Sequence, residues 1–203
     1  MISLNNIHLQ FADKPVFTNL TWTFPDTGLF LLTGANGAGK TTLLNLLTTT
    51  LVPDAGEITF TNDAQDYFIV PHEPFFYDYL TGGEFLELIL KTRHVFDRLP
   101  AAQQLCAQTN LANALDYQII TYSLGMRKKL ILIAGLLSGA KTIFLDEALN
   151  GVDVEATGIL MAQMLQTSRT SLIILISHET ELRPYPYTGI LSLQNGQLQQ
   201  LPT

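Results

Sequence analysis

Residues 29–47 read LFLLTGANGAGKTTLLNLL, and this segment sets the architecture of the whole chain. It opens with the apolar run 29–32, which is typical of a strand buried on both faces. It ends with a leucine-rich helical pattern over residues 41–47. Residues 34–41 between them, GANGAGKT, match the pattern G-x-x-x-x-G-K-[ST]. A strand, a glycine-rich loop and a helix in this order predict that backbone N–H groups surround an anion at the positive end of the helix.

The loop carries the groups that the terminal phosphates of a nucleotide require. Glycines leave room for N–H groups to turn inward, Lys40 can reach the β- and γ-phosphates, and the hydroxyl of Thr41 can hold Mg²⁺. A glycine-rich turn before a helix, without a ligand, is the alternative interpretation. We expect the nucleotide to contact Gly34, Asn36, Gly37, Ala38, Gly39, Lys40, Thr41 and Thr42.

A second candidate site lies at the end of another apolar run. Residues 143–145 are followed directly by Asp146 and Glu147. At the carboxyl edge of a sheet, Asp146 can hold Mg²⁺ through a water molecule, and Glu147 can take a proton from an attacking water. Adjacent acids are also common at solvated strand ends, and it is the phosphate loop that favours the catalytic interpretation.

The composition describes a globular chain that is acidic overall. Of its 203 residues, 47% are apolar and 14% are charged, and the formal net charge is -7. A mean hydropathy of +0.21 is high and favours strands covered by helices on both faces. An acidic balance argues against the phosphate-backbone contacts that drive nucleic-acid binding, so no nucleic acid is expected as a partner. A single cysteine, Cys106, excludes an internal disulfide.

No stretch of the sequence predicts a membrane span. The apolar runs 130–137 and 171–176 fall far short of the ~18 residues that a spanning helix needs. The opening sequence MISLNNIHLQ lacks the basic start and the long apolar run of a signal peptide. We therefore expect a cytoplasmic chain, and its one cysteine fits a reducing compartment.

Strands and helices alternate along most of the chain, which predicts an α/β sheet. From Glu73 to about Gly139 the pattern changes to successive helices, and we interpret this section as an insertion. The Asn195-Gly196 pair suits the tight turn of a hairpin. Strands are predicted at residues 2–10, 22–24, 29–32, 58–60, 67–70, 142–145, 171–177, 191–193 and 198–201, and helices at 41–47, 84–93, 101–114, 127–137 and 154–166.

Further motifs resemble those of the ABC-family ATPase domain. Residues 122–129, YSLGMRKK, resemble the family's signature, usually written LSGGQ, and lie upstream of the acidic strand. An ordinary helix N-cap at Ser123 is the simpler interpretation of that segment. Residues 150–153, NGVD, resemble the family's D-loop. Residues 176–179, ISHE, resemble its switch segment, with His178 at the end of a predicted strand.

The resemblance extends from Phe11 to the predicted hairpin, and it implies a shared site. Phe11 stands where the family places an aromatic ring against adenine, and Phe17 is the rival candidate. Two subunits are implied to face each other head to tail, so that ATP lies between Lys40 of one and the signature of the other. In that arrangement Glu147 acts as the base and His178 steadies the γ-phosphate. The signature residues implied in binding are Ser123, Gly125 and Met126.

The implied fold is α/β: a P-loop NTPase core with a RecA-like sheet, an antiparallel β lobe and an inserted helical lobe. Residues 1–203 would form one ABC-type nucleotide-binding domain, with the helical lobe at about 73–139. The implied function is an ATP-binding and hydrolysing subunit of an ABC transporter, with ATP and Mg²⁺ as cofactors. It would power transport through a separate integral membrane permease, and its signature resembles those of export subunits. Through that permease the chain would lie peripherally on the inner face of the cell membrane.

Some positions depart from the family's pattern. His72 stands where the family has a glutamine that contacts Mg²⁺ and the attacking water, and we expect a neutral His72 to join Thr41 and Asp146 at the metal. The signature has Leu124 and Met126 where glycine and glutamine are common. Two other functions therefore stay open: a weakly hydrolysing regulatory partner in a heterodimeric complex, and a soluble ABC ATPase that does not transport.

Overall fold

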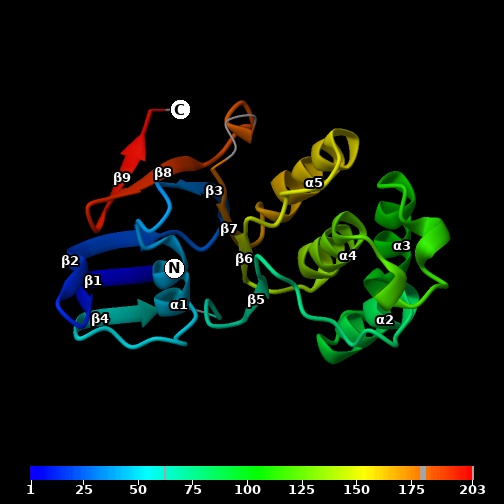
Figure 1. The fold of residues 1–203 in the computed structure, drawn as a ribbon, viewed down its shortest axis with the longest axis horizontal. Coiled ribbons are helices and arrows are strands. Elements are labelled where there is room, and N and C mark those ends of the chain that lie inside the picture. The colour runs from blue at the N-terminus through cyan, green and yellow to red at the C-terminus, as the bar shows by residue number, and fades with distance from the viewer. Residues whose placement is uncertain (62, 179–181, 203) are drawn as a thin grey trace.

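The computed structural model describes residues 1–61, 63–178 and 182–202, so Glu179 of the predicted switch segment lies outside the described residues. The strands form a 3-stranded sheet in the order β2-β1-β4 and a 6-stranded sheet in the order β5-β6-β7-β3-β8-β9. In Figure 1 the small sheet and helix α1 lie on the left, and helices α2, α3 and α4 gather on the right. The large sheet runs between these two parts.

The large sheet is parallel except at one edge. Parallel pairing joins β5 to β6, β6 to β7, β7 to β3 and β3 to β8, and β9 returns antiparallel to β8. Because parallel strands end at the same edge of a sheet, the residues that follow β3, β5, β6 and β7 come together there. The strands are β3 (Gly28–Thr33), β5 (Tyr67–Val70), β6 (Thr142–Asp146), β7 (Leu172–Ile176), β8 (Gly189–Gln194) and β9 (Gln197–Leu201).

Alternate residues of the central strands belong to two separate cores, because successive side chains of a strand point to opposite faces. Leu145 and Leu175 join the core that contains the apolar residues of α2 to α5. Phe144 and Ile174 join the core that contains those of α1 and the small sheet. Every residue of β6 and β7 is buried, as a parallel sheet covered on both faces requires.

Helices cover both faces of this sheet. They are α1 (Lys40–Leu47), α2 (Gly82–Thr92), α3 (Leu99–Gln108), α4 (Leu124–Leu137) and α5 (Val154–Thr167), with short 3-10 turns at Phe96–Arg98, Ala112–Ala114 and Ile119–Thr121. The sequence pattern predicted that this helix begins at residue 84. A capping box between Thr81 and Glu84 makes α2 begin two residues earlier, at Gly82. Within the described ranges, no helix has the length and apolar character needed to cross a membrane.

The predicted helix at residues 101–114 is wrong in its second half. Helix α3 ends at Gln108, and Asn110 adopts the left-handed conformation with φ 57. A left-handed residue of this kind ends an α-helix, because the next carbonyl and N–H groups point out of the helical ladder. The rest of the predicted helix is reduced to the turn Ala112–Ala114.

The small sheet contains β1 (Ile2–Phe11), β2 (Lys14–Phe24) and β4 (Ala55–Phe60). Strand β2 is much longer than the predicted strand at residues 22–24. Its buried residues Phe17, Leu20 and Phe24 do not alternate strictly, because the β1–β2 register shifts along the pair and Asn19 has φ 55. Such bulges change which face a residue occupies, so the period-2 pattern is lost from the sequence.

The predicted Asn-Gly hairpin is confirmed. Asn195 and Gly196 both have positive φ, 49 and 71, as a tight primed turn between β8 and β9 requires. The turn packs on β2, because a Cβ added to Gly196 would lie 2.5 Å from the carbonyl oxygen of Val16. Gln197 adds a side-chain hydrogen bond to the carbonyl of Thr18. These contacts join the β8–β9 edge of the large sheet to β2 of the small sheet.

Candidate functional site

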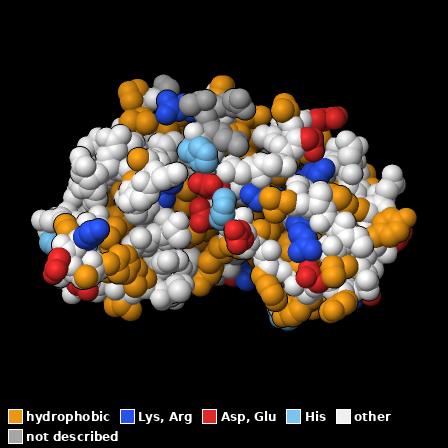
Figure 2. All heavy atoms as spheres, in the orientation of Figure 1, with side chains coloured by type: hydrophobic (Ala, Val, Ile, Leu, Met, Phe, Trp, Pro, Cys, Tyr) orange, Lys and Arg blue, Asp and Glu red, His pale blue; other side chains and the backbone are white. Residues whose placement is uncertain are grey.

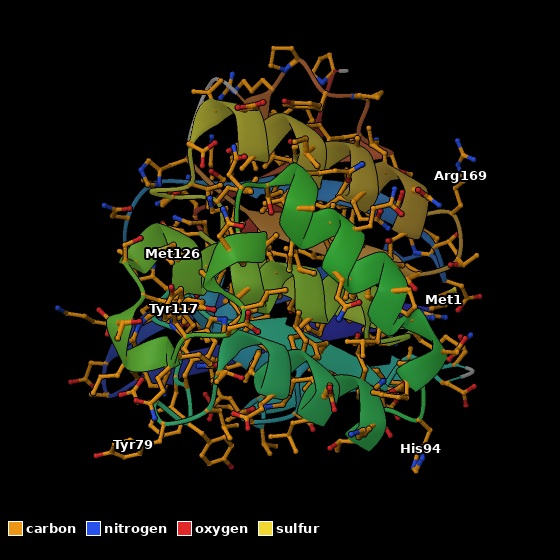
Figure 3. All side chains as sticks on the ribbon, turned by 90° about the vertical axis from the view of Figure 1, so that its right-hand side faces the viewer. Met1, Tyr79, His94, Tyr117, Met126 and Arg169 are labelled. Atoms are coloured by element: carbon orange, nitrogen blue, oxygen red, sulfur yellow. The ribbon has the colours of Figure 1, made fainter. Side chains whose placement is uncertain are left out.

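The loops that follow several parallel strands meet at one edge of the large sheet. β3 leads into residues 34–39, β5 into His72, β6 into Glu147 and β7 into His178. Figure 2 shows this face, where two histidine side chains lie with acidic side chains between them, between the left and right parts of the molecule. In the side view of Figure 3, Met126 lies on the opposite edge from Met1 and Arg169.

The loop at residues 34–39 needs its glycines. A Cβ on Gly34 would lie 2.7 Å from the carbonyl oxygen of Leu193, a distance that real Cβ atoms do not adopt. Gly39 is the N-cap of α1 and has φ 101, a conformation that favours glycine. Gly37 has φ 79, and a Cβ there would meet nothing within 4 Å, so the tip of the loop is open. The loop therefore turns sharply and leaves space in front of the helix.

The same loop fits a bound phosphate group. Helix α1 has no side-chain hydrogen bond at its N-cap and no acidic residue in its first turn, so the protein leaves the positive end of the helix uncompensated. Lys40 is only 8% exposed, and its Nζ donates to the carbonyls of Gly34 (2.8 Å) and Ala35 (3.1 Å). The ammonium thus lies folded over the loop. A cation and uncapped N–H groups in one place suit an anionic ligand.

Asp146 is a buried carboxylate beside this loop. It ends β6 and is 9% exposed. Burial raises the pKa of its carboxyl group, and the charge of Glu147 raises that pKa further. His72, Lys40 and Lys128 act in the opposite direction but do not cancel the effect. The protein alone therefore leaves the Asp146 charge incompletely compensated, and a divalent cation would stabilise it.

The carboxylate of Glu147 is held from several sides. Its Oε2 accepts a hydrogen bond from Asn150 Nδ2 at 2.9 Å and lies 3.3 Å from His72 Nδ1. Its Oε1 lies 3.3 Å from His178 Nδ1. The backbone of Glu147 has φ 49, which is uncommon for a residue with a side chain and marks a position fixed by its surroundings. The structure thus brings the predicted base, the predicted switch histidine and His72 together.

The predicted metal contacts differ in chemical character. Thr41, in the first turn of α1, and Asp146 supply the hard oxygen ligands that Mg²⁺ prefers. The charge of Lys40 lowers the pKa of Asp146, so the acidic strand end lies near the phosphate loop. These residues fit a magnesium ion. His72 offers a nitrogen that faces Glu147 in this structure, and its side chain is 55% exposed. A metal contact of His72 stays a prediction.

The signature residues lie on a different element. Ser123 is the N-cap of α4, and its Oγ accepts a hydrogen bond from Met126 N–H at 3.3 Å. The core residues of α4 and α1 belong to opposite faces of the sheet, and Figure 1 shows the two helices apart. Among the described residues, no hydrogen bond or ion pair joins residues 123–126 to residues 34–42. One chain does not bring the two predicted halves of the site together.

The two candidates for base stacking differ in exposure. Phe11 is 52% exposed and lines an open hollow of about 600 Å³ with Ala38 of the phosphate loop and Gly196 of the hairpin. Phe17 is 1% exposed and packs in the core beneath α1. A buried ring offers no face to a ligand, so the burial of Phe17 removes the rival candidate. Adenine stacking on Phe11 stays a prediction.

Two contacts of Glu147 were missed in the sequence. Asn150 was assigned only to the D-loop, and its Oδ1 is buried with no hydrogen-bond partner in the described part of the chain. Lys128 of α4 is 2% exposed, and its Nζ donates to the carbonyl of Glu147 at 3.1 Å. The sequence did contain a signal. Lys128 and Lys129 stand directly before the apolar run of a predicted helix, and a helix that is apolar over this run buries the lysines next to it.

This parallel sheet, with a glycine-rich loop between β3 and α1 and an acidic end on β6, defines a P-loop NTPase fold. The family model described as ABC transporter matches residues 17–150. The chain therefore belongs to the ABC transporter family.

Named relatives cover most of the chain. The cytochrome c biogenesis ATP-binding export protein CcmA 2 of Salmonella paratyphi A is 30% identical over 191 residues, which cover 88% of this chain and 90% of the relative. The zinc import ATP-binding protein ZnuC of Saccharophagus degradans is 27% identical and covers 90% of this chain and 71% of the relative. A solved ATP binding subunit of an ABC transporter has a TM-score of 0.82 at 20% identity, over 99% of this chain and 90% of that one. This last likeness shows the fold.

Proposed function

We propose that this chain is the ATP-binding and hydrolysing subunit of an ABC transporter and powers transport through a separate membrane permease. The observation that carries the proposal is one edge of the sheet. There the phosphate loop with its buried Lys40 lies near the buried carboxylate of Asp146, and Glu147 follows directly. Membership of the ABC transporter family supports ATP as the nucleotide.

The residues divide the chemistry of hydrolysis among them. Lys40 and the uncapped N–H groups of α1 balance the negative charge on the β- and γ-phosphate oxygens in the transition state. Thr41 and Asp146 would hold Mg²⁺, which supplies further positive charge to the same phosphates. Glu147 takes a proton from the water that attacks the γ-phosphorus, and His178 steadies the γ-phosphate. ADP and inorganic phosphate are released.

A second ATP-binding subunit completes each nucleotide site. Ser123, Gly125 and Met126 surround the first turn of α4, where Leu124 is 58% exposed, and they make no described contact with the phosphate loop of their own chain. In a head-to-tail dimer these residues face the nucleotide that the partner holds. ATP then keeps the dimer closed, and hydrolysis lets it open.

A patch of exposed aromatic residues supports a membrane partner. Phe75, Tyr77 and Tyr79 are 82%, 64% and 80% exposed, and Tyr117 is 64% exposed. The two segments are adjacent, because Ile120 N–H donates to the carbonyl of Asp78 at 3.0 Å. Figure 3 shows Tyr79 and Tyr117 on the same edge as Met126. Large exposed apolar side chains that gather on one surface mark protein interfaces. The membrane permease docks on this patch, on the inner face of the membrane.

Two finer points belong to the same proposal. Residues 1–203 act as one nucleotide-binding unit, and the inserted helices at about 73–139 form the lobe that moves with the permease. The direction of transport is export, which the resemblance of residues 122–126 to export subunits supports. The relatives include one named for export and one named for import, so their names alone do not fix the direction.

Glu147→Gln separates binding from hydrolysis. The substitution removes the proton acceptor and keeps the side chain's size, so calorimetry should still detect the binding of Mg-ATP. Phosphate release should slow by about 10²- to 10⁴-fold, the usual contribution of a general base. Lys40→Ala should remove the heat of binding itself, because the phosphates lose their buried cation.

The matched control is Glu87→Gln, an exposed glutamate of α2 paired with Lys91 outside the site. It should change neither binding nor turnover. Near-normal phosphate release by Glu147→Gln would remove Glu147 from the role of base. Unchanged binding by Lys40→Ala would remove the loop as the phosphate site. Binding without any phosphate release by the unmodified chain would instead favour a regulatory subunit.

A further inference from the structure

Lys128, which the chemistry above does not use, lies directly under the candidate base. It belongs to the second turn of α4, and it is 2% exposed. Its Nζ donates to the carbonyl oxygen of Glu147 at 3.1 Å. Burying an ammonium group is unfavourable unless hydrogen bonds satisfy it, so the fold must hold this contact closely.

The contact fixes an uncommon backbone. Glu147 adopts φ 49, and its N–H donates to the carbonyl of Ile176 in β7 at 3.0 Å. With Lys128 on its carbonyl, the residue is held by β7 on one side and by α4 on the other. A left-handed residue with a side chain persists only where its surroundings over-determine it. This backbone directs the carboxylate toward Asn150, with which it shares a 2.9 Å hydrogen bond.

We propose that Lys128 is a positioning residue for Glu147, because it holds the Glu147 carbonyl and so keeps the carboxylate aimed for proton transfer. The inference rests on the proposed function, in which Glu147 is the base. Its consequence is a link between helix α4 and hydrolysis. Ser123 is the N-cap of the helix that carries Lys128, so in the proposed dimer the nucleotide of the second subunit and the support of Glu147 meet on one helix.

Other contacts fasten the same helix to the loop that follows Glu147. A Cβ on Gly125 would lie 2.7 Å from the carbonyl oxygen of Gly151, so the two backbones touch. Lys129 Nζ donates to Asp153 Oδ2 at 3.2 Å, and Asp153 is the N-cap of α5. The first turns of α4 therefore pack closely against the loop 147–153.

Lys128→Met keeps the apolar stem of the side chain and removes the donor. We expect kcat for ATP hydrolysis to fall roughly 10- to 100-fold, the effect of a misplaced catalytic group. The kcat is compared at saturating Mg-ATP, because the charge of Lys128 also acts on Asp146 and its loss can change the KM. Lys128→Arg keeps a buried cationic donor and should recover part of the loss. An unchanged kcat in Lys128→Met would overturn the proposal.

A double-substitution cycle distinguishes positioning from general damage. If Lys128 acts through the Glu147 carboxylate, Lys128→Met should have no further effect on single-turnover hydrolysis in a Glu147→Gln background. Arg93→Met removes a largely buried cation whose partners, Ser138 and Asp66, lie outside the loop 147–153, and its effect should be the same in both backgrounds. An equal loss from Lys128→Met with and without the carboxylate contradicts the proposal.

Failure of the proposed function gives a different result. Normal hydrolysis by Glu147→Gln alone would remove the base itself, whatever Lys128 does. Thermal unfolding of each variant is measured alongside. If Lys128→Met does not fold, Lys128→Leu, which also has an apolar side chain without a donor, enters the same cycle and is judged by the same criteria.

Discussion

The burial of the Asp146 carboxylate destabilises the folded state of the nucleotide-free chain. Burial and the neighbouring Glu147 raise its pKa, which means that the folded chain binds the Asp146 proton more tightly than the unfolded chain does. The folded state is therefore penalised when Asp146 is ionised and relieved when it is protonated. Groups that cost stability in this way are typical of functional sites.

Asp146→Asn should accordingly raise the melting temperature of the nucleotide-free chain at pH 7. The gain should shrink as the pH falls toward the ordinary carboxyl pKa of 3.8, because the unmodified side chain is then protonated as well. Asp153→Ala is the control of opposite sign. The pKa of Asp153 is lowered, first by the N–H of Ala156 at the start of α5, so its stabilisation is present at pH 7 and is lost as the pH falls through the lowered pKa. A lower melting temperature for Asp146→Asn at pH 7 would contradict this account.

The chemistry of single residues was only partly predictable from the sequence. Lys40, Asp146 and Glu147 were predicted because each follows a strand at a short, fixed distance along the chain. The supports of Glu147 were not, since Lys128 reaches it only through the packing of α4 against the sheet. The orientation of α4 on the sheet depends on its packing against apolar residues that are distant in the sequence. A local sequence pattern does not predict such packing.

Helix α4 carries residues of two proposed roles. Its N-terminus carries the signature residues, and its second turn supports Glu147 through Lys128. The helix has no acidic residue in its first turn, and among the described residues the Ser123 side chain accepts only from the N–H of Met126, so in the proposed dimer an anion of the other chain would meet a positive helix end. The same end is exposed at Leu124.

Leu124→Glu tests this end of the helix. A carboxylate in the first turn of α4 suits the helix dipole of the isolated chain, so the melting temperature should hold or rise. In a head-to-tail dimer the same charge faces the partner's phosphates. In the slow Glu147→Gln background, light scattering should therefore show that ATP no longer produces a dimer, although calorimetry still shows binding.

Leu124→Gln is the neutral control, and it should leave the ATP-dependent dimer intact. A dimer that forms equally well with Leu124→Glu would mean that this end of α4 does not meet the partner's nucleotide.

Element prediction succeeded where a pattern was strong and local. The buried parallel strands appeared as short apolar runs, and the Asn-Gly turn of the hairpin had its own chemistry. Strand β2 was underestimated because its bulges break the alternation of buried residues. The end of α3 was missed because the left-handed Asn110 interrupts an otherwise helical composition.

In the proposed function, the molecule keeps its nucleotide site apart from its docking surface. The predicted phosphate and metal residues lie at the carboxyl edge of the sheet. The aromatic patch lies on residues 75–79, before α2, and on Tyr117, between α3 and α4, and these two segments pair with each other. Asp78 of that patch region forms an ion pair with Arg127 of α4 at 3.1 Å. Asp78 lies between Tyr77 and Tyr79 of the patch, so its ion pair links a partner docked there to the helix that carries Lys128.

Docking on the patch is tested by Phe75→Ser combined with Tyr79→Ser. Both side chains are more than half exposed, so folding and basal ATP hydrolysis should be unaffected. Sedimentation with membranes of the organism that makes the chain should decrease. Val52→Ser, an equally exposed apolar residue between α1 and β4, is the matched control and should sediment normally. Unchanged sedimentation of the double variant would place the membrane partner elsewhere.

The hollow beside Phe11 is assembled from parts of the chain that are translated at very different times. Its walls come from the first strands, from the phosphate loop and from the turn at Asn195 and Gly196. A nascent chain emerging from the ribosome has the phosphate loop long before it has the last wall. The phosphate loop itself packs on Leu193 of β8 through Gly34, so both the loop and the hollow take their final form only after β8 and the turn that follows it have been made.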